Sequence, residues 1–461
     1  MRSSALALLA GAFTAAVAGT AAGAADAPQS LPGSVSRLAE LPLDQLLDVE
    51  ISGASNRPQA VADAPASVTV LTAQDFRTYG WRTLGAALRA VRGFYLGSDR
   101  VYDFIGVNGF QTPADYNSRM LLLIDGARLN EPIYDSAPVA EDFPLDVELI
   151  DRVEIIRGPS SSVYGANALF GVINVVTRPI ADLDGASAGA EAGPYGTRRA
   201  RFAAGSAPAD GARWLLEASR ARSDGETLSF PDEAYTAGMP VAGTDYKRIT
   251  RFYGRIESGQ QSLVAYYGCR ESGLPGGQYG TIPGPGNLAR DTYYGLNGSW
   301  IAATALGQLQ ARVGARRYQY DGNYIYPATP NVDYSYAQAL SAELRFVAAV
   351  VERHTVTYGG DWQRNTTARY MNYDVSPYVV YTDLDHGSRR AGLFVQDDVR
   401  ASERVNLSAG ARFDSDTGVD PRVSPRLGII VRPSEATVVK LLYGSAFRPP
   451  NLNELAYPAP N

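Results

Sequence analysis

The chain has 461 residues, with 42 Lys and Arg against 48 Asp and Glu, and a formal net charge of −6. At about 150 residues per domain, this length allows roughly three compact domains, or one small domain and a large closed sheet. Acidic and basic residues are mixed throughout, which argues against nucleic acid as a partner. The single cysteine excludes an intrachain disulfide and a zinc site built on several cysteines. His354 and His386 lack the HExxH spacing, so we expect no metal site.

The N-terminus has the pattern of a secretory signal. A positive charge at Arg2 precedes an uncharged, mostly apolar run, residues 5–17, and small residues then lead to a cleavage site near Ala24. We therefore predict a signal peptide over residues 1–24. A retained membrane anchor is the alternative, because residues 3–25 are long enough to span a membrane. No later apolar run reaches the length of a transmembrane helix, so a membrane location of the mature chain would require a β-barrel.

A compact α/β unit is predicted over residues 65–180, after a leader, residues 25–64, that is rich in Pro, Ser and Ala. Residues 68–71 form a predicted strand. Thr72 is then the expected N-cap of a helix, with Asp75 in its first turn, where a carboxylate favours the positive end of the helix dipole.

The rest of this unit alternates helical and extended patterns. Leu84, Leu88 and Val91 recur at helical spacing, and Gly93 is the predicted stop. Residues 120–124 form a continuous apolar strand that turns at Asp125 and Gly126. Two further predicted strands, residues 153–156 and 172–176, complete a small mixed sheet.

From about residue 185 onward, apolar and polar side chains alternate in segments of about ten residues, with connections that are alternately short and long. Leu309, Ala311 and Val313 face one way, whereas Gln310 and Arg312 face the other. This pattern predicts a transmembrane antiparallel β-barrel with apolar residues toward lipid. A soluble β-sandwich is the alternative for any single segment, but the number of repeats, the signal peptide and the 28 tyrosines favour the barrel.

No catalytic arrangement is evident, and we predict that the protein is not an enzyme. The glycine-containing segment RGPSSSVYGAN, residues 157–167, lacks the lysine and the spacing of a phosphate-binding loop. Neither histidine falls near its serines, so a Ser-His-Asp arrangement cannot be assembled there. Asp397 and Asp398 are adjacent on a predicted strand and therefore point to opposite faces.

Several motifs resemble the plug domain and barrel of TonB-dependent outer-membrane receptors. In the plug these are APASVTVLT (64–72), LLLIDGARLN (121–130), IDRVEIIRGP (150–159), VYGANA (163–168) and GVINVVTR (171–178). In the barrel they are SPRL (424–427) and LYGSAFRPP (442–450). The resemblance implies a plug over residues 65–180 and a barrel over residues 181–461, in the outer membrane of a Gram-negative bacterium.

A complete barrel of this family has about 22 strands. We count about 13 candidate strands after residue 184, which is too few to close such a barrel. A barrel with an open edge in lipid would leave backbone groups unpaired. We therefore expect that this sequence lacks the last strands of the barrel, and that residues 25–461 alone do not form a closed, heat-modifiable barrel.

The resemblance also implies energised import. The plug would close the barrel lumen, substrate would bind from outside, and a TonB protein of the inner membrane would pull on a short segment before the plug. The best candidate for this TonB box is Asp48, Val49, Glu50, Ile51 and Ser52. Its extended character suits strand addition to a partner's sheet edge. An inert linker is the alternative.

Two further groups of site residues are predicted. The plug motif comprises Arg157, Gly158, Pro159, Tyr164 and Gly165. Arg157 either pairs with lumenal barrel carboxylates such as Glu343 and Asp414 or caps its own loop. The expected substrate-binding residues lie on the plug loops 97–104 and 131–139 and beside them: Tyr95, Asp99, Tyr102, Tyr134 and Asp135.

The predicted function is uptake of a scarce, bulky nutrient, with a ferric siderophore as the first candidate substrate. Cobalamin, haem and glycans are alternative substrates, because aromatic side chains stack on all of these. A non-transporting surface receptor or signal sensor is the other class of function. Sensors of the family carry an extra N-terminal domain of about 80 residues, for which the roughly 40 mature residues before Pro65 leave no room. We expect no cofactor, and we expect outer-membrane lipid, a TonB protein and an extracellular small molecule or metal chelate as partners.

Overall fold

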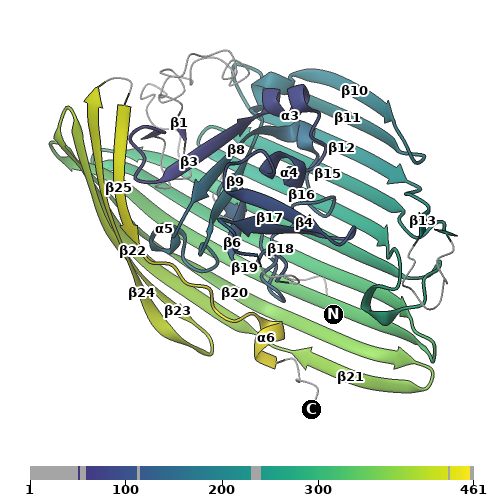
Figure 1. Ribbon diagram of the computed structural model, residues 1–461. Helices are drawn as coiled ribbons and strands as arrows, with labels where there is room; N and C mark the ends of the chain where they lie inside the picture. Colours follow the sequence, from purple (N-terminus) through teal and green to yellow (C-terminus); the bar gives the residue numbers. More distant parts are fainter. Residues whose placement is uncertain (1–49, 52–58, 112–114, 230–239, 435–436, 457–461) are drawn as a thin grey trace. The chain divides into compact units, whose positions relative to one another are not determined.

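The computed structural model describes residues 50–51, 59–111, 115–229, 240–434 and 437–456 (Figure 1). The predicted signal peptide and most of the predicted leader lie outside these ranges. No helix in the described part of the chain is long and apolar enough to cross a membrane.

The predicted plug contains a five-stranded mixed sheet. Its strand order is β3 (Ser67–Thr72), β8 (Ile150–Arg157), β9 (Gly171–Thr177), β6 (Met120–Ile124) and β7 (Ala127–Arg128). The pair β6–β9 is parallel and the others are antiparallel, which confirms the predicted mixed sheet. The remaining elements of the plug are α3 (Ala73–Tyr79), α4 (Leu84–Leu88), β4 (Phe94–Ser98), β5 (Asp103–Val107), η2 (Val147–Leu149), α5 (Ser161–Tyr164) and η3 (Ile180–Leu183).

Local sequence signals set the ends of several plug elements. The Thr72 side chain accepts from the Asp75 N–H at 3.2 Å, and the Asp75 carboxylate accepts from the Thr72 N–H at 2.7 Å, which is the reciprocal capping box. Asp125 and Gly126, both with positive φ, form the two-residue turn between β6 and β7. Helix α4 ends at Leu88, earlier than the stop predicted at Gly93.

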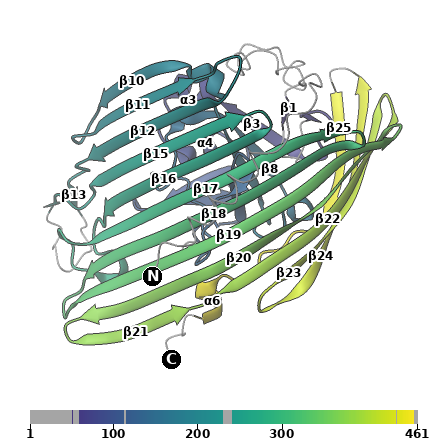
Figure 2. The ribbon, with the colours of Figure 1, turned by 180° about the vertical axis from the view of Figure 1, so that it is seen from behind.

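A 14-stranded antiparallel sheet forms most of the rest of the described chain (Figures 1 and 2). Along its path lie β10 (Gly185–Ala192), β11 (Arg198–Ser206), β12 (Arg213–Ser223), β15 (Lys247–Ser258), β16 (Gln261–Gly273), β17 (Leu288–Thr304), β18 (Gly307–Ile325), β19 (Pro330–Val351), β20 (His354–Val375), β22 (Ser388–Ser402), β23 (Val405–Asp416), β24 (Val419–Ser434) and β25 (Thr437–Gly444), and β21 (Tyr378–Asp385) pairs with β20.

Thirteen strands lie on this path, in agreement with the predicted number. Shorter elements outside both sheets are the strand pairs β1 (Glu50–Ile51) with β2 (Gln59–Ala60) and β13 (Leu228–Ser229) with β14 (Pro240–Val241), the turn η4 (Gln278–Gly280) and the helix α6 (Leu452–Ala456).

The strands of the large sheet turn at two opposite edges. The connections at these two edges differ in length. At one edge, two residues connect β17 to β18, β19 to β20, and β22 to β23. We call this the short-turn edge. At the opposite edge, residues 274–287 connect β16 to β17, and the excursion between β20 and β22 includes β21. We call this the long-loop edge, although two residues suffice there between β23 and β24. The predicted alternation of short and long connections therefore holds for most of the sheet.

The two faces of the large sheet carry different side chains. Leu344, Leu393 and Leu441 are 54%, 66% and 70% exposed, whereas the neighbouring Arg345 and Arg412 are buried on the other face. The plug lies on the face with the buried polar residues (Figure 1). The other face therefore presents a band of exposed apolar side chains, as expected for a surface that contacts lipid.

Three side chains at the short-turn edge hold residues 61–66, which follow the TonB-box candidate in the chain. Lys440 donates to the carbonyls of Val61 at 2.7 Å and Ala64 at 2.8 Å. Arg432 and Asn406 both donate to the Asp63 carboxylate at 2.8 Å. We call Asn406, Arg432 and Lys440 the leader clamp.

Replacing Lys440 by Met is expected to speed amide hydrogen exchange in residues 61–67, because the clamp then loses its charge-assisted hydrogen bonds. Such bonds contribute about 1.5–3 kcal/mol, so local opening should become roughly tenfold or more frequent. The exposed Arg404 lies at the same edge, and Arg404→Ala is the matched control. Equal exchange in both variants would contradict the clamp.

Candidate substrate-binding site

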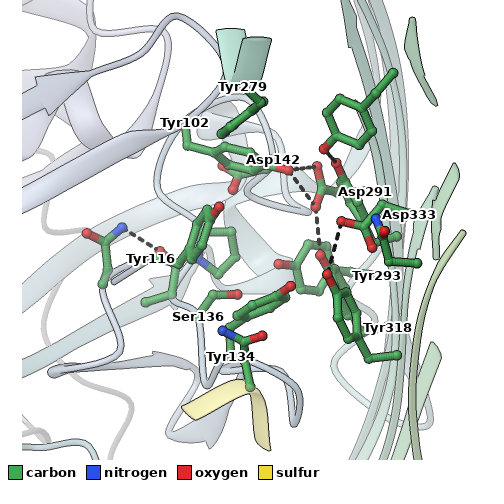
Figure 3. Close-up of a pocket in the computed structure, with 18 of the residues that line it drawn as sticks. Tyr102, Tyr116, Tyr134, Ser136, Asp142, Tyr279, Asp291, Tyr293, Tyr318 and Asp333 are labelled. Atoms are coloured by element: carbon green, nitrogen blue, oxygen red, sulfur yellow. Dashed lines mark hydrogen bonds between the residues drawn. The ribbon is translucent and has the colours of Figure 1, made fainter. Parts of the chain in front are cut away.

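A cavity of about 370 Å³ lies between the plug and strands β17 to β20, toward the long-loop edge. Figure 3 shows residues that line it. Its lining is unusually rich in tyrosine. Ten tyrosines line it: Tyr102, Tyr116, Tyr134, Tyr279, Tyr293, Tyr318, Tyr320, Tyr324, Tyr326 and Tyr370. The other polar residues that line the cavity include Asp103, Ser136, Asp142, Asp291, Asn331, Asp333, Asn372 and Asn453.

The plug wall of the cavity is a continuous series of aromatic rings. Tyr116 lies between Tyr102 and Tyr134, with ring centroids 5.4 and 5.2 Å away. Tyr134 then reaches Tyr370 of β20 at 6.2 Å. Burial raises the pKa of Tyr102, Tyr116 and Tyr134 well above the ordinary value, so these hydroxyl groups stay protonated at neutral pH and can donate hydrogen bonds.

The buried Glu131 shapes the loop that carries Tyr134. Its carboxylate accepts from the N–H groups of Ile133 at 2.5 Å, Tyr134 at 2.9 Å and Ser136 at 3.1 Å. Burial raises the pKa of Glu131 to about 7 against these hydrogen bonds, which favour the charged form. Asn451, just before α6, donates to the Tyr134 carbonyl at 3.1 Å. The loop is therefore fixed from inside the plug and from the end of the chain that follows β25.

Asp291 of β17 joins the plug to the sheet wall of the cavity. It accepts from the Tyr318 hydroxyl at 2.8 Å and the Tyr102 hydroxyl at 3.2 Å (Figure 3). The fully buried Arg270 of β16 forms an ion pair with Asp291, donates to the Val101 carbonyl at 2.6 Å and lies 4.6 Å over the Tyr102 ring. Arg270 and Asp291 together hold Tyr102 at the cavity.

Two further carboxylates face the cavity without an ion pair in the described part of the chain. Asp142 accepts from the Ala140 N–H at 2.9 Å, and burial raises its pKa to about 7. Asp333 of β19 accepts from the Tyr370 hydroxyl at 3.3 Å, while its other oxygen, Oδ1, is buried without a hydrogen-bond partner among the described residues. The cavity therefore offers carboxylate oxygens to a ligand.

The structure brings together two of the five predicted substrate-binding residues, Tyr102 and Tyr134. The other three do not line the cavity. Tyr95 is 39% exposed on β4. Asp99 accepts from the N–H groups of Val101 and Tyr102, and the buried Asp135 pairs with Arg390 at 3.4 Å.

The sequence analysis did not identify the residues of the sheet wall, such as Asp291, Tyr318 and Asp333. The segments 321–336 and 370–385 of the sequence are rich in tyrosine and lie near the same edge of the sheet, but Asp291 and Tyr318 fall outside both segments.

Arg157 stays within the plug. Of its two predicted roles, pairing with a barrel carboxylate such as Glu343 or Asp414 is therefore wrong, and its hydrogen bonds go to other plug segments. It donates to the Arg92 carbonyl at 3.1 Å and the Ser67 hydroxyl at 2.7 Å. Arginines of the sheet already neutralise both carboxylates: Arg312 pairs with Glu343 at 3.1 Å and Arg412 with Asp414 at 2.8 Å. The plug instead meets these arginines through its backbone, as where Arg312 donates to the Gly126 carbonyl at 3.1 Å.

Other residues of the plug motif lie close to the sheet. Gly165 has a φ of 74°, and a Cβ there would lie 2.8 Å from Nη2 of Arg412. Only glycine fits this close approach without strain. Tyr164 ends α5 beside it, and Gly158 and Pro159 lie in the connection before α5.

The TonB-box candidate is described only in part. Glu50 and Ile51 form β1, which pairs with β2. Ile51 is 1% exposed and packs in an apolar cluster with residues such as Leu121 and Val172. Asp48, Val49 and Ser52 lie outside the described residues.

Comparison with known proteins agrees with this architecture. The TonB-dependent Receptor Plug Domain matches residues 60–172, and the TonB dependent receptor-like beta-barrel matches residues 164–461. The chain is 24% identical over 417 residues to the vitamin B12 transporter BtuB of Vibrio vulnificus, covering 89% of this chain and 65% of that protein.

Two solved structures have the same fold. The ferric enterobactin receptor PfeA of Pseudomonas aeruginosa, as the mutant R480A in complex with enterobactin, superposes with a TM-score of 0.65 at 17% identity, covering 85% of this chain and 64% of that one. The ferric yersiniabactin uptake receptor FyuA of Yersinia pestis gives 0.64 at 15% identity, covering 83% and 63%. The chain spans less than two thirds of the length of each of these three relatives. The family match covers most of the chain, which therefore belongs to the TonB-dependent receptors, outer-membrane proteins of Gram-negative bacteria.

Proposed function

We propose that the full-length protein is a TonB-coupled importer that binds a ferric siderophore in the tyrosine-lined cavity. The observation that carries this proposal is the position of the cavity relative to the leader clamp. The cavity lies toward the long-loop edge, whereas the clamp and the TonB-box candidate lie at the short-turn edge. In outer-membrane barrels, long loops are extracellular and short turns are periplasmic. Substrate would therefore meet the plug on one side, and a TonB protein would reach it on the other.

The connection from the box to the rest of the plug is short. Residues 50–51 pair with residues 59–60, and the leader clamp holds the chain directly after them. A TonB protein that binds the box by strand addition would load this segment first. The cavity loops would then respond to displacement of the plug as a whole.

Cobalamin is the second candidate substrate. The similarity to a vitamin B12 transporter extends over 89% of this chain, which favours this candidate. Uptake of radiolabelled ferric chelates and of radiolabelled cobalamin, in cells with and without the full-length receptor, separates the two. Receptor-dependent uptake of cobalamin alone would replace the siderophore proposal.

Deletion of residues 48–52 is expected to abolish uptake while surface binding stays unchanged, because the pull requires the box and binding does not. The deletion also removes the buried Ile51. Ile51→Leu, which conserves side-chain volume, is therefore the control and should retain uptake. Equal uptake by the deleted and parent receptors would contradict the assignment of the box.

A further inference from the structure

We infer that the tyrosine-lined cavity selects substrates that carry no net negative charge and that present cationic or hydrogen-bond-donating groups to Asp142 and Asp333. The inference rests on the proposed function, in that it assigns the substrate site to this cavity. It narrows the range of possible substrates, among siderophores and cofactors such as cobalamin, to those that are neutral or cationic.

The charge of the lining carries the first step. Four carboxylates line the cavity, Asp103, Asp142, Asp291 and Asp333, and none of the described residues that line it is Lys, Arg or His. A site for a polyanion typically presents arginine or lysine, because these groups bind carboxylate, phosphate and phenolate oxygens through charge-assisted hydrogen bonds.

The nearest cation is not available to a ligand. Arg270 is fully buried behind Tyr102, and its guanidinium already contacts Asp291 and the Val101 carbonyl. Its remaining face covers the Tyr102 ring. Its charge acts on Asp142 as well as on Asp291, but it pairs only with Asp291. Asp142 and Asp333 therefore keep carboxylate oxygens that no cation of the described chain pairs with.

The tyrosines act in the same direction. Their ring faces carry partial negative charge and attract cations. Their hydroxyl groups donate to neutral acceptors or accept from donors, but a hydroxyl compensates a polyanion less well than a cation does. The buried and unpartnered Oδ1 of Asp333 lies among these rings and is positioned to accept a donor from a ligand.

Two aromatic ions of similar size test this charge rule without knowledge of the natural substrate. Saturation-transfer NMR on the purified full-length receptor would compare benzyltrimethylammonium with benzenesulfonate at pH 8, above the raised pKa of Asp142. The cation should bind, and the sulfonate should bind at least about tenfold more weakly, because each uncompensated carboxylate within a few ångströms repels it. Asp142→Asn and Asp333→Asn keep the side-chain size, and each should weaken binding of the cation by roughly tenfold.

The exposed Asp383, which pairs with Arg369 on β21 and β20 at 3.2 Å, supplies the matched control. Asp383→Asn should change neither affinity. Three results would each overturn the charge rule: stronger binding of the sulfonate than of the cation, an affinity for the cation that is unchanged in both Asn variants, or binding of neither ion. All variants are first checked for the heat-modifiable mobility of a folded barrel, and Asp142→Asn and Asp333→Asn serve as independent tests if one fails to fold.

A second comparison separates this inference from the proposed function. A cationic ferric trihydroxamate, a neutral ferric trihydroxamate and a trianionic ferric tris-catecholate are offered to cells that carry the receptor. Preferential uptake of the first two supports both proposals, whereas preferential uptake of the trianion keeps the importer and overturns the charge rule. Uptake of none of them, together with preferential binding of benzyltrimethylammonium, keeps the charge rule and contradicts the siderophore proposal.

Discussion

Replacing Arg270 by Met is expected to destabilise the full-length receptor by about 3–5 kcal/mol, because Asp291 then remains as a buried carboxylate without its ionic partner. Both side chains are at most 2% exposed, so water cannot take over the lost interaction without rearrangement of the wall. The Tyr102 ring also loses the cation that covers it. The loss therefore affects both the stability of the fold and the position of one cavity residue.

Denaturant unfolding followed by tryptophan fluorescence measures this effect, and a double variant isolates its cause. Arg270→Met combined with Asp291→Asn should recover part of the lost stability, because the uncompensated charge is gone. Arg248→Met is the matched control: Arg248 pairs with Glu271 at 2.8 Å but is 69% exposed, and exposed pairs contribute about 0–1 kcal/mol. A double variant as unstable as the sum of the two single variants would contradict the proposed role of the pair.

Replacing Tyr102 and Tyr134 together by Ala is expected to weaken substrate binding by about 1–3 kcal/mol, the range found for stacking on aromatic platforms. Both rings line the cavity from the plug side, and Tyr116 between them would lose both of its neighbours. The barrel should still fold, because its strands pair independently of these two loops. Equilibrium binding to the detergent-solubilised full-length receptor measures the change.

Tyr95→Ala is the control for this double variant. Tyr95 is a plug tyrosine of the same type, but it lies on β4 outside the cavity lining. Its replacement should leave affinity unchanged. Unchanged affinity in the Tyr102 and Tyr134 double variant, or an equal loss in the Tyr95 variant, would remove the cavity from the binding site.

Features that depend on a few adjacent residues could be predicted from the sequence. The Thr72 cap and the turn at Asp125 and Gly126 follow from side-chain chemistry and positive φ within four residues. The strands of the large sheet follow from period-2 alternation, since one face meets lipid and the other does not. These signals depend on the direction in which neighbouring side chains point. They are therefore sufficient to predict the helix cap, the turn and the strands of the large sheet.

The partners of each inward side chain could not be predicted in this way. From the sequence, Glu343 could pair with an arginine of the plug, such as Arg157, or with one of the sheet. In the structure Arg312 pairs with Glu343, 31 positions away, and also donates to the carbonyl of Gly126, 186 positions away. Asp291 and Tyr102 meet across 189 positions. Asp99 looked like a ligand-binding carboxylate, yet its position in a tight turn makes it an acceptor for the N–H groups of Val101 and Tyr102.

The central claim is that substrate binds between the plug loops and strands β17 to β20. A structure of the full-length receptor with its transported substrate bound tests this claim most directly. The account predicts density in the cavity, in contact with Tyr102 and Tyr134 on one side and Tyr318 and Asp333 on the other. Substrate bound elsewhere on the receptor, with this cavity empty in the same map, would contradict it.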